Sequence, residues 1–164
     1  MARKSSLAAG ALAVAAIFVG TVTMTLASAP SGSTPTLLSR ATFADFKVMA
    51  NPANGAFFKA EAKGSIDVVV RRHDYVAGGY TGWHQHPYPV FISVTSGTLT
   101  FYEYDDPTCT PIVVTAGHGY VDSGRGHMGR NETDQPATDV SVILAPVGAA
   151  FRTELTAPNP YCGF

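Results

Sequence analysis

The sequence predicts an all-β protein, a barrel or a sandwich of short strands. Thr, Val, Tyr and Phe are common between clusters of Gly, Pro and Asp, and the chain has 16 Gly and 11 Pro among 164 residues. This composition is typical of strands joined by turns. Strand-like segments recur at a spacing of roughly ten residues, which favours a sandwich or barrel. No stretch reads as a long helix, and no internal repeat is present.

The strands are predicted from alternation and from turn residues. In Ser65–Arg72 the apolar residues Ile66, Val68 and Val70 alternate with their neighbours, which predicts a strand with one buried face. Ser96-Gly97 separates two β-rich runs and predicts a hairpin. The other predicted strands are 90–95, 98–104, 111–115 and 139–147.

The N-terminal residues 1–29 are expected to be a signal peptide. Arg3 and Lys4 precede an uncharged apolar run over 7–26, and Ala-Ser-Ala at 27–29 fits a cleavage site. The run is also long enough to span a bilayer at about 1.5 Å per residue, so an uncleaved anchor is the alternative. The expected location is therefore secreted or anchored at the outer face of the cell membrane. Any membrane contact would be through this segment.

Residues 30–36, rich in Pro, Ser and Gly, are predicted to be a flexible linker, and 37–164 a single domain with its own core. Removal of Arg3 and Lys4 from the eleven basic residues leaves nine, against twelve acidic residues. The domain is thus mildly acidic and has no basic stripe, which argues against a nucleic-acid partner.

The two cysteines, Cys109 and Cys162, are predicted to form a disulfide, because an even pair in an exported protein is usually oxidised. A closed loop of about fifty residues would stabilise the fold by up to roughly 4 kcal/mol. Metal ligation by both cysteines is the alternative, although their spacing is not that of a zinc site.

Three histidines are candidate metal ligands. His84 and His86 have one residue between them, so on a strand both imidazoles lie on the same face. His127 lies about forty residues later and is a candidate third ligand. His73 and His118 are interpreted as ordinary packed or surface residues.

These histidines fall within two motifs that resemble those of the cupins. The first cupin motif has a glycine, five residues, His-x-His, three or four residues, a glutamate, six residues and a glycine. The second ends Pro-x-Gly-x-x-His-x-x-x-Asn. The positions that match are Gly78, His84, His86 and Gly97 in the first motif, and Gly124, His127 and Asn131 in the second. The resemblance implies a conical β-barrel, the double-stranded jelly roll of cupins.

The sequence departs from both motifs. Val90 occupies the position of the glutamate, Asp122 that of the proline, and Ala116 that of the glycine which opens the second motif. The missing proline is taken to have no chemical consequence. The missing glutamate leaves three neutral imidazoles facing an ion that keeps its full charge, with about three coordination positions open.

The resemblance to three-histidine cupins implies one divalent metal ion, with Fe(II) favoured. The ligand set alone also suits Zn, Mn, Ni or Cu. A barrel that has lost its metal is the alternative. Cupins commonly pair through their barrel edges, so a homodimer is a candidate assembly.

Glu103 is a candidate substitute for the missing carboxylate. If Ser96-Gly97 is a two-residue hairpin loop, Val90 lies opposite Glu103 and the two side chains share a face. The alternative is that Glu103 lies in water at the end of its strand. The residues expected to line the pocket are Val90, Ile92, Phe101 and Tyr88.

Two functions remain open. The first is a metal-dependent enzyme, resembling a dioxygenase, that acts on a small anionic substrate able to neutralise the ion. The second is a non-catalytic module that binds a metal or a small ligand at the cell surface. The open coordination positions favour the enzyme, and the absence of an evident general base favours the binding module.

Overall fold

The computed structural model describes residues 29–53, 55–156 and 159–164, and every regular element within them is a β-strand. The predicted signal peptide falls almost entirely outside this range. Among the described residues, no helix is long and apolar enough to cross a membrane. The strands are β1 (Ser31–Phe43), β2 (Phe46–Ala50), β3 (Phe58–Ala62), β4 (Ile66–Tyr80), β5 (His84–Gln85), β6 (Val90–Ser96), β7 (Thr98–Glu103), β8 (Ile112–Thr115), β9 (Gly119–Asp122), β10 (His127–Arg130), β11 (Ala137–Pro146) and β12 (Thr153–Glu154).

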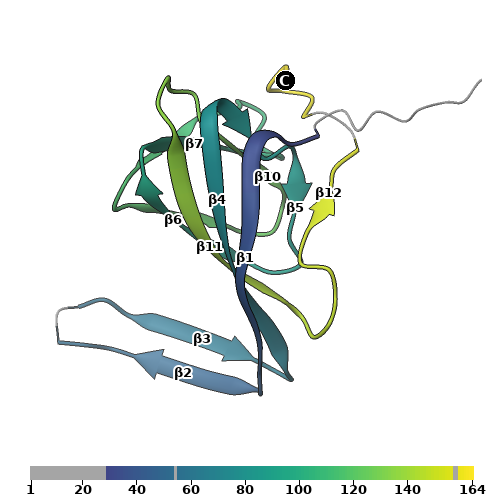
Figure 1. The fold of residues 1–164 in the computed structure, drawn as a ribbon. Helices are drawn as coiled ribbons and strands as arrows, with labels where there is room; N and C mark the ends of the chain where they lie inside the picture. Colours follow the sequence, from purple (N-terminus) through teal and green to yellow (C-terminus); the bar gives the residue numbers. More distant parts are fainter. Residues whose placement is uncertain (1–28, 54, 157–158) are drawn as a thin grey trace, which may run out of the picture.

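Ten of these strands form an antiparallel barrel of two layers (Figure 1). One layer has the order β1-β4-β11-β6-β9, and the other has the order β12-β5-β10-β7-β8. The layers join where Arg130 of β10 pairs with Tyr80 at the end of β4. This arrangement is the predicted jelly roll, and its core lies between the layers around Val69, Leu99, Phe101 and Ile143.

The strands predicted on either side of Gly97 exist, but the hairpin between them is wrong. β6 pairs with β9 and β11, whereas β7 pairs with β8 and β10. Gly97, at a φ of 71°, is the point where the chain crosses from one layer to the other. A Cβ there would lie 2.7 Å from the Pro136 carbonyl oxygen, so the close crossing requires glycine. The turn signal was therefore correct, but it marks a change of layer.

The linker predicted for residues 30–36 is also corrected, because residues 31–36 belong to β1. This strand pairs with β4 along its length, from Ser31 opposite Tyr80 to Phe43 opposite Ile66. β1 pairs with no other described strand, so Pro35 is tolerated on its free edge. The Pro and Gly content of the segment thus marks an edge strand.

A buried carboxylate fastens β1 to β4. Asp67 accepts hydrogen bonds from Arg40 Nε at 2.7 Å, Thr42 Oγ1 at 2.6 Å and the Gly148 backbone amide at 3.0 Å. These three donors lower the pKa of Asp67 to about 2, the Thr42 hydroxyl having the largest effect. The clamp joins three segments that are far apart in the sequence.

The inward face of β4 differs from the apolar face that the alternation suggested. Asp67, Val69, His73 and Tyr75 are buried, whereas Val68 and Val70 are only partly buried. β11 pairs with this strand so that Ser141 faces Arg71 and Asp139 faces His73. Polar side chains from both strands therefore point into the barrel, and they form part of the site described below.

The disulfide between Cys109 and Cys162 fastens the C-terminal segment to the loop after β7. The two cysteines pack against a second core cluster of Trp83, Tyr102 and Met128. The tail continues over Trp83, whose indole Nε1 donates to the Phe164 carbonyl oxygen at 3.0 Å. The bridge thus closes one side of the barrel.

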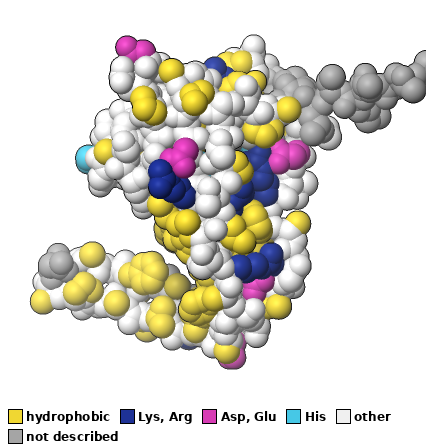
Figure 2. All heavy atoms as spheres, in the orientation of Figure 1, with side chains coloured by type: hydrophobic (Ala, Val, Ile, Leu, Met, Phe, Trp, Pro, Cys, Tyr) yellow, Lys and Arg dark blue, Asp and Glu magenta, His cyan; other side chains and the backbone are white. Residues whose placement is uncertain are grey.

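The remaining two strands, β2 and β3, form a separate hairpin that projects from the barrel (Figure 1). Hydrophobic side chains gather on the hairpin and where it leaves the barrel (Figure 2). A groove of about 620 Å³ lies between them, lined by Phe46, Val48 and Phe58 on one side and Phe91 and Leu144 on the other.

Candidate metal centre

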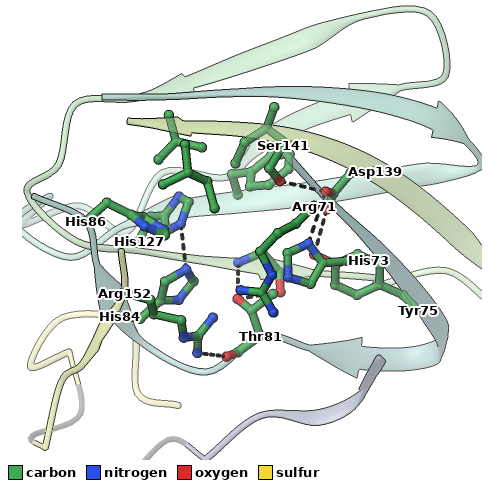
Figure 3. A pocket seen from close by; sticks show the side chains of 15 residues that line it. Arg71, His73, Tyr75, Thr81, His84, His86, His127, Asp139, Ser141 and Arg152 are labelled. Atoms are coloured by element: carbon green, nitrogen blue, oxygen red, sulfur yellow. Dashed lines mark hydrogen bonds and ion pairs between the residues drawn. The ribbon is translucent and has the colours of Figure 1, made fainter. Parts of the chain in front are cut away.

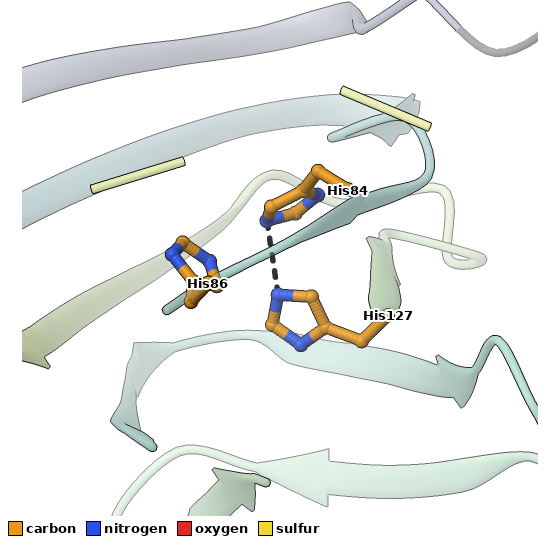
Figure 4. A group of neighbouring side chains, drawn as sticks. All are labelled: His84, His86 and His127. Carbon is orange, nitrogen blue, oxygen red and sulfur yellow. Dashed lines mark hydrogen bonds between the residues drawn. The ribbon is translucent and has the colours of Figure 1, made fainter. Parts of the chain in front are cut away.

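Two strands and the residue that follows one of them bring the candidate ligands together. His84 lies on β5, directly opposite His127 on β10, and His86 follows two residues later. All three are buried, and one ring nitrogen of each lies within 4.8 Å of those of the other two. Figure 4 shows the three imidazoles converging on a common point. The spacing of the two motifs is thus realised as a cluster within one cavity.

Backbone carbonyls hold two of the rings in a defined tautomer. His84 Nδ1 donates to the Gly82 carbonyl at 2.8 Å, and His86 Nδ1 donates to the Phe151 carbonyl at 2.5 Å. A carbonyl can only accept, so each Nδ1 carries the proton and each Nε2 presents its lone pair to the cluster. This outer support is the arrangement that metal-binding histidines need.

The third ring completes a set of donors that fits a divalent ion. His127 Nε2 lies 2.9 Å from His84 Nε2, and the buried His127 Nδ1 has no hydrogen-bond partner among the described residues. Because the His84 nitrogen presents a lone pair, a separation this short requires a proton or a cation between the two atoms. Three imidazole nitrogens suit zinc, copper, nickel and iron.

The electrostatic environment keeps the imidazoles neutral. Burial, reinforced by neighbouring positive charge, lowers the pKa of His84 and of His127 well below the ordinary value. Burial lowers the pKa of His86 to about 4, with Arg152 contributing. Neutral imidazole is the form that binds a metal, so the cluster is ready to do so near pH 7.

The position of the missing glutamate is apolar, and Glu103 does not face it. Val90 is buried and lines the cavity beside the histidines. Glu103 instead pairs across the strands with His127, and its Oε1 accepts a hydrogen bond from the Tyr120 hydroxyl at 2.5 Å. The predicted pairing of Val90 with Glu103 is therefore wrong, because β6 and β7 belong to different layers.

The carboxylate that does lie opposite Val90 is Asp122 of β9. It is fully buried, and its Oδ1 accepts from the Gly124 amide at 3.0 Å, while Oδ2 has no partner among the described residues. Burial and the nearby Glu103 raise the pKa of Asp122 to about 6. Asp122 is outside the group of mutually close ligand atoms formed by the three histidines.

The histidines line a cavity of about 20 Å³, which is room for one or two water molecules (Figure 3). One part of its wall is apolar and includes the predicted residues Val90, Ile92 and Phe101. Tyr88 does not line it: this side chain is 41% exposed and lies against the groove beside the hairpin.

The other part of the wall is polar, and the sequence reasoning missed it. It consists of Arg71, His73, Tyr75, Thr81, Asp139, Ser141 and Arg152. Asp139 organises the deepest part, accepting from the Tyr75 hydroxyl at 2.8 Å and the Ser141 hydroxyl at 2.9 Å, with His73 Nδ1 at 3.2 Å. The sequence does hold a signal for this wall. Polar residues occupy every second position at 71, 73 and 75 and at 139 and 141, so on each strand they share one face.

The fold is a small β-barrel of the jelly-roll type whose three converging histidines could hold a metal ion. A family model for the cupin domain matches residues 71–143, which include both motifs and the whole cluster. Residues 71–143 of the chain therefore form a cupin domain.

The solved structures that resemble the chain include a recombinant oxalate oxidase in complex with glycolate, with 24% identity over 53% of this chain and 45% of that chain, and a TM-score of 0.44. An uncharacterised protein with a double-stranded β-helix domain from Klebsiella pneumoniae has 20% identity over 70% of this chain and 81% of its own, with a TM-score of 0.46. The cupin domain of a transcriptional regulator from Enterobacter cloacae has 13% identity over 70% of this chain and 97% of its own, with a TM-score of 0.45. The chain spans less than half of the oxalate oxidase. No curated protein matches it.

Proposed function

We propose that the protein binds one divalent metal ion through His84, His86 and His127, with Fe(II) as the favoured ion. The observation that carries this proposal is the convergence of three buried, neutral imidazoles, of which two are oriented by backbone carbonyls. No carboxylate of the described residues belongs to this cluster, so the ion would keep its full charge. A metal centre of this kind binds an anionic ligand at its open positions.

The activity we propose is a metal-dependent, dioxygenase-like reaction on a small anionic substrate. The metal would supply open coordination positions for the substrate and for oxygen. The chain would supply a small cavity, part of whose wall is apolar. His73, Tyr75 and Asp139 form a connected polar network on the opposite wall, which offers groups that can exchange protons.

The metal proposal is tested by metal analysis of the purified domain. We expect one equivalent of metal in the wild type and its loss in His84→Ala and in His127→Ala. His118→Ala is the matched control, because this histidine is exposed and its imidazole bonds only to Thr115 among the described residues. Metal that persists in both cluster variants would contradict the proposal.

Oxygen consumption then separates an enzyme from a binding module. The metal-loaded protein is supplied with thiol, diketone and flavonol substrates, and His86→Ala is the negative control. Consumption that depends on His86 supports the enzyme. Tight metal binding without consumption favours the alternative, a metal- or ligand-binding module.

We also propose that the protein is exported. The disulfide between Cys109 and Cys162 supports this, since such bonds persist mainly outside the cytosol. Fractionation of cells that express the full chain is the test. A protein found only in the cytosol with two free thiols would overturn the proposal.

A further inference from the structure

Two cavities share one wall. Arg71, His73, Thr81 and Arg152 line both the inner cavity, which holds the histidines, and a second cavity of about 260 Å³. The second cavity is lined on its other side by the start of β1, through Pro30, Ser33 and Pro35. These four shared residues, called the partition below, therefore lie where the cavity of the metal centre adjoins a larger outer chamber.

Arg71 is the unusual member of this partition. Each of the other arginines that the structure describes has a carboxylate oxygen within 3.3 Å. The half-buried Arg71 has neither an ion pair nor a hydrogen bond to any described residue. Its guanidinium lies 5.2 Å from the ring centroid of Phe151, which supports the side chain from one face. The five N–H donors of a partly desolvated cation are thus left for another partner.

The surrounding charges leave this cation unneutralised. Arg152, on the same side of the cavity, is paired with Glu154 at 2.5 Å and donates to the Thr81 carbonyl at 2.6 Å (Figure 3). Asp139 is occupied by Tyr75, Ser141 and His73. Both acids attract the Arg71 guanidinium at longer range, but neither contacts it, so Arg71 has no ion-pair partner among the described residues and the partition is cationic.

We propose that Arg71, assisted by Arg152, binds the carboxylate of a small anionic substrate whose other end reaches the three histidines. The planar guanidinium matches a carboxylate through two parallel hydrogen bonds. The small inner cavity limits the part of the substrate next to the histidines to a few atoms, whereas the outer chamber accommodates the remainder. The substrate class is thus a short acid that carries a second anionic or metal-binding group. This inference rests on the proposed metal function.

The test is calorimetric binding of malonate and of thioglycolate to protein loaded with Co(II), with uncharged malonamide as the ligand control. Arg71→Gln is expected to weaken binding of either acid about 10- to 100-fold, the effect of losing a charge-assisted pair. Arg71→Lys should restore part of the affinity, since it keeps the charge but loses the fork.

Arg72→Gln is the matched control, because Arg72 is the next residue on β4, points away from the cavity and pairs with Asp74. Its affinity for the acids should equal that of the wild type. Arg71→Gln should keep its cobalt and stay close to the wild type in thermal stability, since the substitution removes only the contact with the Phe151 ring and breaks no hydrogen bond or ion pair to a described residue. If Arg71→Gln binds both acids as tightly as the wild type, or if the wild type binds neither, the proposal is overturned. Loss of cobalt from the wild type would instead overturn the metal function, and malonate binding to the metal-free protein would still test Arg71.

Discussion

Asp122 lies directly opposite Val90 in the pairing of β9 with β6, and both side chains are buried. Each of these two residues is a departure from the cupin motifs. One motif lacks its carboxylate at 90, and the other gains a carboxylate at 122. The residue that replaces the proline thus places a buried acid beside Val90, at the position where the motif has its glutamate.

Val90→Glu is expected to tighten divalent metal binding by at least about tenfold. The new carboxylate would join three neutral imidazoles and add an anionic ligand. Metal titration measures the change, and Val90→Gln, of the same size without the charge, is the control. Equal affinities for the two variants would contradict the prediction.

Asp122→Asn should stabilise the metal-free protein at pH 8. The pKa of Asp122 is raised to about 6, so the folded state holds a proton that the unfolded state releases near pH 4. The contribution of Asp122 to the stability of the folded state is therefore unfavourable above pH 6 and disappears below pH 4. Two pKa units correspond to at most about 3 kcal/mol. Chemical unfolding at pH 4 and pH 8 checks this, and Asp105→Asn, at an exposed ion pair, should show no such difference between the two pH values.

The three buried histidines should reduce the stability of the metal-free protein as the pH falls from 6.5 to 4, in opposition to the contribution of Asp122. His86 has its pKa lowered to about 4 in the folded state, so between these values the unfolded state binds the additional proton. The stability that depends on neutral His86 is fully present above pH 6.5 and declines as the pH falls through this window. His84 and His127 act in the same direction. His86→Asn should reduce the slope measured by urea unfolding, whereas the exposed His118→Asn should not. An unchanged slope in His86→Asn would disprove the assignment.

Reduction of the disulfide should release the C-terminal segment from Trp83. The closed loop of 53 residues predicts a loss of up to about 4 kcal/mol. Trp83 is the single tryptophan, and it is buried and stacked on Phe164. Its fluorescence should therefore shift to longer wavelength in the double variant Cys109→Ser/Cys162→Ser. A spectrum identical to that of the oxidised wild type would show that the tail stays in place without the bridge.

The sequence predicts the fold class and the histidine cluster well, for different reasons. Alternation and turn residues are local signals, and they locate most of the strands. The histidines are predictable because motif spacing encodes which residues meet. Local signals do not encode strand partners, so the turn at Gly97 was assigned to a hairpin and Glu103 was placed opposite Val90.

The polar wall escaped prediction because its residues come from two strands, and their alignment depends on register. Arg71 and Ser141 meet only through the pairing of β4 with β11. Val68 and Val70 lie on the face of β4 opposite to the cavity, and their alternation suggested that this face was the buried one. Adjacent residues of a strand point to opposite faces, so the face predicted from these valines puts Arg71 in solvent, whereas in the structure it lines the cavity.

The first residues of β1 wall the outer chamber, and β1 is an edge strand held by β4 alone among the described strands. Its pairing is interrupted between Ser31 and Ser33. The mouth of the chamber and the metal ligands thus belong to separate segments of the chain. Substitutions at Ser33 or Pro35 can reshape the opening without altering a ligand, so substrate preference and metal affinity are able to evolve independently.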